Sequence, residues 1–157
     1  MYDTHKPDAA ADGLRIGLAV SRYHAEITDA MRAAAVRQFI DAGGAEKDLR
    51  IVDVPGAFEL TAVCRALAAR GDLDAIVAIG CIISGQTTHD RYIASAVAQG
   101  LTMITVQTGV PIAFGVLTCQ GPEQARARAS AKRNKGAEAM AAAIETCRAV
   151  RAVTGGR

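Results

Sequence analysis

Short apolar runs alternate with longer segments of helical periodicity along most of the chain. The first run, LRIGLAVS at Leu14–Ser21, is apolar over almost its whole length, as in a strand that is covered on both faces. Thr28 and Asp29 then offer side chains that can cap a helix, and apolar residues follow at helical spacing until Gly43 and Gly44. This pattern predicts a strand followed by a helix.

The same alternation recurs to the end of the chain. In order, its predicted elements are a strand at 49–54, a helix at 57–70, a strand at 73–83, a helix from about 88 to 99, apolar runs at 101–108 and 112–118, and a helix from 122 to about 153 with a break near 134–136. Alternating strands and helices specify a mainly parallel sheet with helices on both faces. We therefore predict a three-layer α/β sandwich of the flavodoxin-like, doubly wound kind.

Length and composition agree with this architecture. A chain of 157 residues is near the modal size of one domain. Half of its residues are hydrophobic, but only 4% are aromatic and none is Trp, so the core must consist of Ala, Val, Ile and Leu in tight layers. We expect a single domain over residues 14–157, preceded by a loose polar tail at 1–13.

Charge and cysteine content exclude several classes of protein. The 18 basic and 16 acidic residues give a net charge of +2 without a run of like charge, so nucleic acid is not an expected partner. No apolar segment reaches transmembrane length and the first residues form no secretory signal, so we expect a cytoplasmic protein that does not bind membranes. The cysteines have no metal-ligand spacing and are expected to be reduced and mostly buried: Cys64, Cys81, Cys119 and Cys147.

In doubly wound sheets, ligands bind where the carboxyl ends of strands meet the amino ends of helices. The candidate segments are those that follow each predicted strand, namely SRYHAE at 21–26, PGAFE at 55–59, SGQTTH at 84–89 and the residues near FGVLT at 114–118. Together they supply aromatic rings for stacking, a carboxylate, a Gly/Thr turn and a histidine.

The segment GCIISGQT, at Gly80–Thr87, nearly matches a phosphate-binding loop. However, Gln86 occupies the position of the lysine, and Cys81–Ile83 belong inside a strand, so we reject a nucleotide hydrolase. The amides of Gly85–Thr88 still open a helix, where backbone N–H groups and the helix dipole favour a single phosphate.

His89 lies in the first turn of that helix. It is either a proton carrier beside a bound phosphate or an exposed turn residue, and spacing alone favours neither. His24, in a loop, and His5, in the tail, are weaker candidates.

The other candidate residues also have ordinary structural interpretations. The basic cluster RARASAKRNKG, at 126–136, is by default a solvated helix face, with a phosphate clamp through Arg128 as the alternative. Glu59 is compatible with a helix N-terminal charge, Phe58 with the core and Tyr23 with packing. Each of these signals is weak by itself.

Taken in order, these segments resemble the family of 6,7-dimethyl-8-ribityllumazine synthases, from about Leu14 to Val150. The pieces that carry the resemblance are SRYHAEIT, VPGAFEL, GCIISGQTTHDRYI, PIAFGVLT and EQARARASAKRNKGAEA. It implies a transferase of riboflavin biosynthesis that condenses 5-amino-6-ribitylaminouracil with 3,4-dihydroxy-2-butanone 4-phosphate and releases phosphate and water. It also implies that no metal or organic cofactor takes part.

The resemblance further implies a role for each candidate residue. The residues implied to bind the substrate are Tyr23, which stacks on the pyrimidine, Ala57 and Glu59, which bind the ribityl chain, Cys81, Ile82 and Ile83 beside the ring, and Phe58. The residues implied to bind phosphate are Gly85, Gln86, Thr87 and Arg128. His89 would carry protons, whereas Phe114 and Lys135 would come from a neighbouring subunit.

An interfacial site implies a homo-oligomer, and a pentamer, a decamer and a sixty-subunit shell all fit the sequence. Riboflavin synthase is a further expected partner. Two other functions fit the same motifs: a non-catalytic paralogue that holds a lumazine or flavin, and a protein whose function is to form a shell. Because a carrier needs neither His89 nor Arg128, their presence favours the enzyme.

Overall fold

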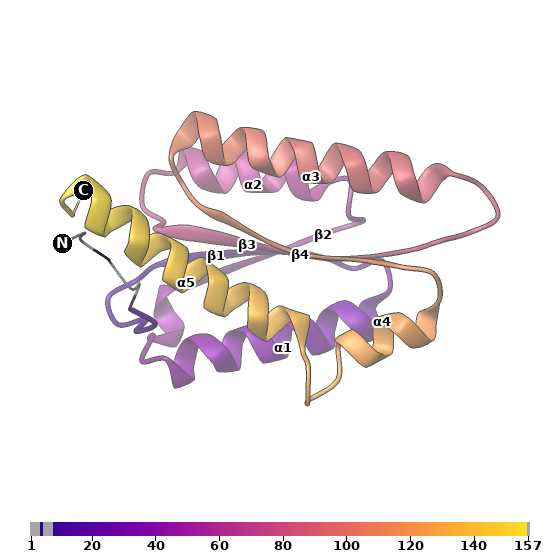
Figure 1. Cartoon of the computed structure of the whole chain (residues 1–157), viewed down its shortest axis with the longest axis horizontal. Helices are drawn as coiled ribbons and strands as arrows, with labels where there is room; N and C mark the ends of the chain where they lie inside the picture. The colour runs from indigo at the N-terminus through magenta and orange to yellow at the C-terminus, as the bar shows by residue number, and fades with distance from the viewer. Residues whose placement is uncertain (1–3, 5–7, 157) are drawn as a thin grey trace.

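The computed structural model describes residue 4 and residues 8–156. Its centre is a sheet of four parallel strands in the order β2-β1-β3-β4 (Figure 1). The strands are β1 (Ile16–Ser21), β2 (Leu49–Val54), β3 (Ala75–Ile83) and β4 (Ile112–Cys119). β1 and β3 are buried over almost their whole length because both of their faces are covered.

Helices cover both faces of the sheet. α2 (Leu60–Ala69) and α3 (His89–Thr108) lie on one face, and α1 (Ala25–Asp41), α4 (Pro122–Arg128) and α5 (Lys135–Thr154) lie on the other (Figure 1). A 3₁₀ turn, η1 (Glu46–Asp48), leads into β2. The predicted three-layer α/β sandwich is confirmed. The C-terminal helix is broken, as predicted, but the break covers residues 129–134 and so begins earlier than expected.

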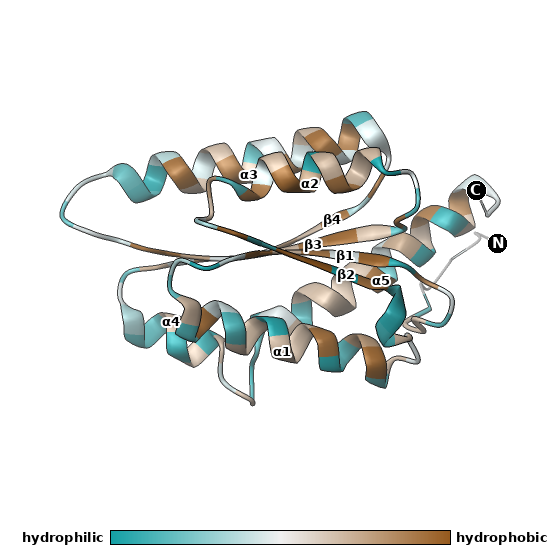
Figure 2. Ribbon diagram, turned by 180° about the vertical axis from the view of Figure 1, so that it is seen from behind, coloured by the Kyte–Doolittle hydropathy of each residue, from teal (hydrophilic) through white to brown (hydrophobic). Residues whose placement is uncertain are grey.

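Each face of the sheet has its own core. Figure 2 shows strands that are hydrophobic along most of their length between helices of mixed surface. On one side, Val20 and Ile79 pack with Met31 and Phe39 of α1 and with residues of α5. On the other side, the buried residues of α2 and α3 pack on the opposite face of β1 and β3. As predicted, all four cysteines are free and buried.

The predicted start of the first helix was wrong. The helix begins at Ala25, and its N-cap is His24 in the left-handed conformation, with φ 60° and ψ 50°. Thr28, expected to cap the helix, lies inside it, and its amide donates to the His24 carbonyl at 3.1 Å. This is the first hydrogen bond of the helix itself, and the helix has no side-chain cap.

The predicted end of the helix at about residue 99 was also wrong. α3 continues through the apolar run at 101–108 and ends at Gly109, which adopts a positive φ of 73°. Gly100 does not stop the helix. A Cβ at Gly100 would lie 2.7 Å from Cγ2 of Thr61, so this glycine allows α3 to pack closely on α2.

Part of the expected loose tail is held in place. The amide of Ala11 donates to the carbonyl of Ala42 at 2.8 Å, and the Arg148 guanidinium donates to the carbonyls of Ala10 and Asp12. His5 lies outside the described residues. Within the described part of the chain, no helix has the length and apolarity to cross a membrane.

Candidate active site

The strand order reverses between β1 and β3. The connection after β1 leads to β2 on one side of the sheet, and the connection after β3 leads to β4 on the other side. The two connections leave in opposite directions, so a crevice opens at the carboxyl ends of β1 and β3. A cavity of about 840 Å³ lies there. Its walls come from the segments after β1, β2 and β3 and from the first turns of α3.

Exposed aromatic rings line this cavity. Tyr23 is 66% exposed, Phe58 60% and Tyr92 74%. The ordinary interpretation of Phe58 as a core residue is therefore wrong, and Tyr23 is not a packing residue within this chain. Because burying such rings is favourable, they are suited to stacking on a flat ligand.

Tyr23 is held by the continuation of the sheet. Its amide donates to the carbonyl of Pro55 at 3.1 Å, and the amide of Arg22 donates to that of Val54 at 2.8 Å. The ring of His24 meets the Tyr23 ring edge to face, with 4.7 Å between centroids and 79° between planes. The left-handed backbone of His24 turns the chain into α1 and places this ring in the cavity wall.

A carboxylate stands on the wall formed after β2. Glu59 is the N-cap residue of α2 and lines the cavity beside the buried Ala57. At Gly56 an added Cβ would lie 2.9 Å from Oε2 of Glu59. Glycine at this position therefore leaves the space that the carboxylate occupies.

The end of β3 forms an apolar floor from Cys81, Ile82 and Ile83. Burial raises the pKa of the Cys81 thiol to about 11, with a smaller contribution from the nearby Cys119. The thiol is therefore protonated at neutral pH and is suited to packing against a ring rather than to attack as a thiolate.

The loop at 84–88 leads from this floor into α3. Gly85 and Thr87 line the main cavity, whereas Gln86 lines a second, polar cavity of about 490 Å³ on the far side of the loop. His89 is the first residue of α3, is exposed and lines the main cavity. Loop amides and an imidazole thus stand together at a helix N-terminus, which is the arrangement that favours a phosphate.

Besides Gln86, three predicted residues lie outside the main cavity. Phe114, Arg128 and Lys135 line a separate cavity of about 420 Å³ along β4 and α5. Since β4 is an edge strand, this cavity is on the outer edge of the sheet. Lys135 forms an ion pair with Glu138, and Arg128 donates to the carbonyl of Gln124.

The main cavity brings together most of the residues predicted to bind the uracil substrate, two of the loop residues and the histidine: Tyr23, Ala57, Phe58, Glu59, Cys81, Ile82, Ile83, Gly85, Thr87 and His89. Sequence reasoning did not select Gly56, Asp90 or Tyr92, which line the cavity, and it made His24, which lines it too, a weaker candidate. Tyr92 follows His89 by three residues and so shares its helix face, a signal that the spacing contained. In the described part of the chain, no cluster of three or more potential metal ligands occurs.

Known proteins with similar sequences share one description. The family model for 6,7-dimethyl-8-ribityllumazine synthase matches residues 13–151. The chain is 41% identical to the 6,7-dimethyl-8-ribityllumazine synthase of Thermus thermophilus, over 96% of this chain and 97% of that protein. It is 45% identical to the synthase of Kineococcus radiotolerans, over 94% and 92% of the two chains, and 45% identical to that of Frankia casuarinae, over 88% and 87%.

Proposed function

The chain belongs to the 6,7-dimethyl-8-ribityllumazine synthase family, and we propose that its active site is completed by a neighbouring copy of the same chain. As a member of this family it is a transferase of riboflavin biosynthesis. It condenses 5-amino-6-ribitylaminouracil with 3,4-dihydroxy-2-butanone 4-phosphate and releases phosphate and water.

The main cavity provides the place for the uracil substrate. The pyrimidine stacks on Tyr23, and the apolar floor of β3 lies beside the ring. The ribityl hydroxyls meet the Glu59 carboxylate, which accepts hydrogen bonds from them. Glu59 has no ion-pair partner among the described residues, so its oxygens are available to a ligand.

The position of Phe114 carries the proposal of a shared site. Phe114 pairs with Ala78, five residues before Ile83 at the main cavity, so it lies about 16 Å along the strand from that cavity in its own subunit. It is 48% exposed on the outer edge of the sheet. A second copy that packs its β4 edge against the main cavity would bury this ring and close the cavity.

Arg128 lines the same outer cavity as Phe114 and Lys135. We therefore assign the phosphate to two subunits: the amides of Gly85–Thr87 come from one, and the Arg128 guanidinium comes from the next. A guanidinium recognises phosphate oxygens with two parallel hydrogen bonds and adds the charge that the loop lacks.

The surface of α3 supports assembly into a homo-oligomer. No charged residue occurs between Tyr92 and Pro122, and Met103 and Val106 on α3 are exposed. A long uncharged helix face is typical of a surface that other copies cover. We propose a pentamer as the basic assembly, a reducing cytoplasm as the location, in accord with the four free thiols, and riboflavin synthase as the protein that receives the product.

Proton transfer is the main demand of the reaction. The uracil amine attacks the ketone carbon and a water is lost to give an imine, after which the C–O bond to phosphate breaks as a carbon-bound proton leaves. A tautomeric shift and ring closure with loss of a second water complete the product. Each step moves a proton near the phosphate-binding loop, where His89 stands, and we assign the catalytic role to this imidazole.

The first test measures lumazine absorbance from the purified protein with both substrates, against the spontaneous rate. We expect a rate well above background and a decrease of about 100-fold in His89→Ala, which is the usual contribution of a general acid–base group. Because His89 is exposed, the variant should fold as well as the parent. A rate at background, together with tight binding of lumazine or flavin, would instead identify a binding paralogue.

The shared site is tested by subunit complementation. His89→Ala and Arg128→Ala are each expected to be nearly inactive alone. When the two are unfolded and refolded together, about a quarter of randomly paired sites contain both intact residues, and activity should return to that extent. If no activity returns while assembly is normal, His89 and Arg128 act from the same subunit and the proposal is wrong.

A further inference from the structure

The loop at 84–88 is fastened to the rest of the molecule at its two ends. At its start, the amide of Ser84 donates to the carbonyl of Cys119 at 2.9 Å, which extends the pairing of β3 with β4 by one step. Ser84 therefore belongs to the rigid sheet. Its hydroxyl donates to Oδ2 of Asp90, in the first turn of α3, at 2.9 Å.

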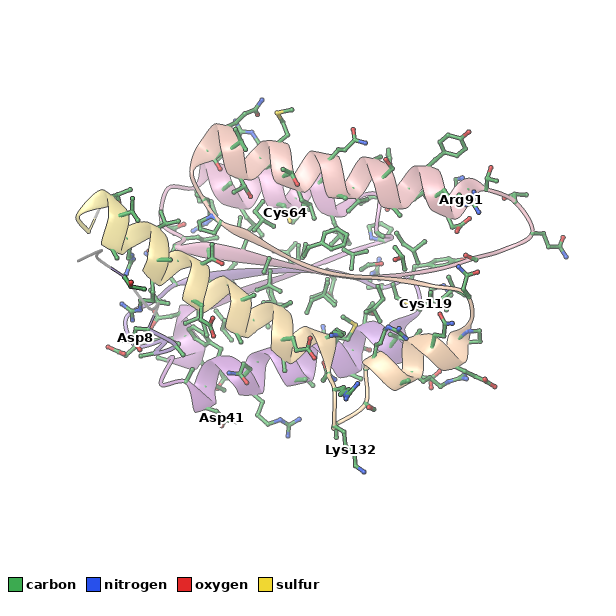
Figure 3. The ribbon with its side chains drawn as sticks, viewed as in Figure 1. Asp8, Asp41, Cys64, Arg91, Cys119 and Lys132 are labelled. Carbon is green, nitrogen blue, oxygen red and sulfur yellow. The ribbon has the colours of Figure 1, made fainter. Side chains whose placement is uncertain are left out.

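The Ser84–Asp90 hydrogen bond thus connects the sheet directly to the helix that bears His89. Figure 3 labels Arg91, the residue after Asp90 in α3, and Cys119, the residue of β4 whose carbonyl accepts from the Ser84 amide. The residues between Ser84 and Asp90 form the loop that we assign to the phosphate. Both ends of the loop are held at a fixed separation when the bond is made.

The loop has few other restraints among the described residues. Gly85 through His89 are exposed, and a Cβ added at Gly85 would meet no atom within 4 Å. The only side-chain hydrogen bond within it joins the amide of His89 to Oγ1 of Thr87 at 3.4 Å, which is long. The direction of the loop amides therefore depends on the bond between Ser84 and Asp90.

A carboxylate at this place has an electrostatic disadvantage. Asp90 lines both the main cavity and the polar cavity behind the loop, so its charge faces the space where a phosphate dianion binds. The carboxylate and the phosphate carry charges of the same sign and therefore repel each other. A carboxylate in the first turn also interacts favourably with the helix dipole, but an acid elsewhere in that turn would do this without facing the phosphate.

We propose that Asp90 is a positioning residue that acts through Ser84, holding the phosphate-binding loop and the first turn of α3 in their working arrangement. The proposal rests on the proposed function, since it assigns the phosphate to this loop. Asp90 contacts no reacting atom. Its contribution is to orient the amides of Gly85–Thr87, and it should therefore affect the butanone phosphate and not the uracil.

The test is a double-mutant cycle with Ser84→Ala, Asp90→Ala and the combined variant, using the assembled protein. The measured quantities are KM for each substrate and the Kd of inorganic phosphate by calorimetry. We expect Ser84→Ala to raise the KM of the butanone phosphate and the Kd of phosphate about tenfold, as for loss of a hydrogen bond to a charged group. The KM of the uracil should change less than twofold.

The cycle isolates the bond from the charge. Ser84→Ala should have no further effect in the Asp90→Ala background, because the acceptor is already missing. Asp90→Asn retains an acceptor oxygen and removes the repulsion, so its phosphate Kd should equal or fall below that of the parent. The proposal is overturned if Ser84→Ala leaves phosphate binding unchanged, raises both KM values alike, or acts equally in the presence and absence of Asp90.

A different result would show that the proposed function itself is wrong. The unmodified protein would then form lumazine no faster than the spontaneous reaction, whatever the variants do. The phosphate Kd still reports on the loop, since calorimetry requires no turnover. A phosphate Kd that is the same in all variants would then overturn the inference independently.

Discussion

The two ends of the sheet use their charged residues in opposite ways. At the amino end, Arg15, Arg70 and Arg151 form ion pairs with Asp72 and Asp74. At the carboxyl end, the charged and titratable residues that line the main cavity form no ion pair among the described residues. Charges that neutralise each other stabilise the fold, whereas unpaired groups remain available to a ligand.

This contrast predicts that substitutions at the amino end change stability and that substitutions at the carboxyl end change substrate binding. The largest expected effect is that of Asp74→Ala. The Asp74 carboxylate accepts from the amide of Arg15 at 2.7 Å and from the guanidinium of Arg151, and so connects β1, β3 and α5. We expect a loss of about 2 kcal/mol, which is about 30-fold in the unfolding constant.

The measurement for Asp74→Ala is the midpoint of denaturant unfolding together with kcat and KM of the folded protein. Asp74→Asn is the matched variant: it keeps an acceptor for the Arg15 amide and should lose less stability. A decrease in kcat of about 30-fold, as large as the expected change in the unfolding constant, would contradict the separate roles of the two ends of the sheet.

At the carboxyl end, Tyr23→Ala should weaken binding of the uracil. Loss of one stacked ring is worth about 1 kcal/mol, so KM for this substrate should rise by about fivefold. Tyr23→Phe retains the ring and should be nearly normal. Because Tyr23 is exposed, the unfolding midpoint should not move, and a large shift would show that the ring packs within the fold.

Sequence reasoning located this end of the sheet because strand ends follow from the apolar runs. It placed Tyr23, Glu59 and His89 after consecutive strands of the sheet, and parallel strands bring such segments to one edge. It did not find the hydrogen bond between Ser84 and Asp90, because that contact depends on the angle between β3 and α3. The spacing of residues along the sequence does not determine this angle.

The two errors in helix ends come from rules that consider only neighbouring residues in the sequence. The start of α1 was placed at Thr28 because the rule for caps looks for a side-chain oxygen, whereas this helix starts after the left-handed His24 without a side-chain cap. The end of α3 was placed before Gly100 because glycine commonly ends helices. Its role here is a close approach to Thr61, and a tertiary contact of this kind is not encoded in the neighbouring residues.

A smaller effect is expected from Gly56→Ala, which adds one methyl group to the cavity wall. The new Cβ would lie 2.9 Å from Oε2 of Glu59, and the flexible carboxylate can move away at little cost in stability. We expect the KM of the uracil to rise about threefold because the ribityl contacts are displaced. Gly121→Ala is the control, since its Cβ also meets nothing and it lies outside the cavity, and an equal effect there would exclude the explanation through Glu59.

The smallest effect is expected at the amino end, from Asp72→Asn. The hydrogen bond from Arg70 lowers the pKa of the Asp72 carboxyl in the folded protein, and Arg15 adds to this. A group with a lowered folded pKa stabilises the fold above its unfolded pKa of about 4, and this contribution is lost as the pH falls through the folded pKa. Stability of the parent should therefore exceed that of Asp72→Asn slightly at pH 6, and the difference should vanish towards pH 2.

Urea midpoints across this range, with Asp41→Asn as a control for the removal of one surface charge, measure the difference. If the urea midpoints of parent and variant differ by the same amount at all pH values, Asp72 contributes through packing. Its ion pairs with Arg15 and Arg70 would then not stabilise the amino end.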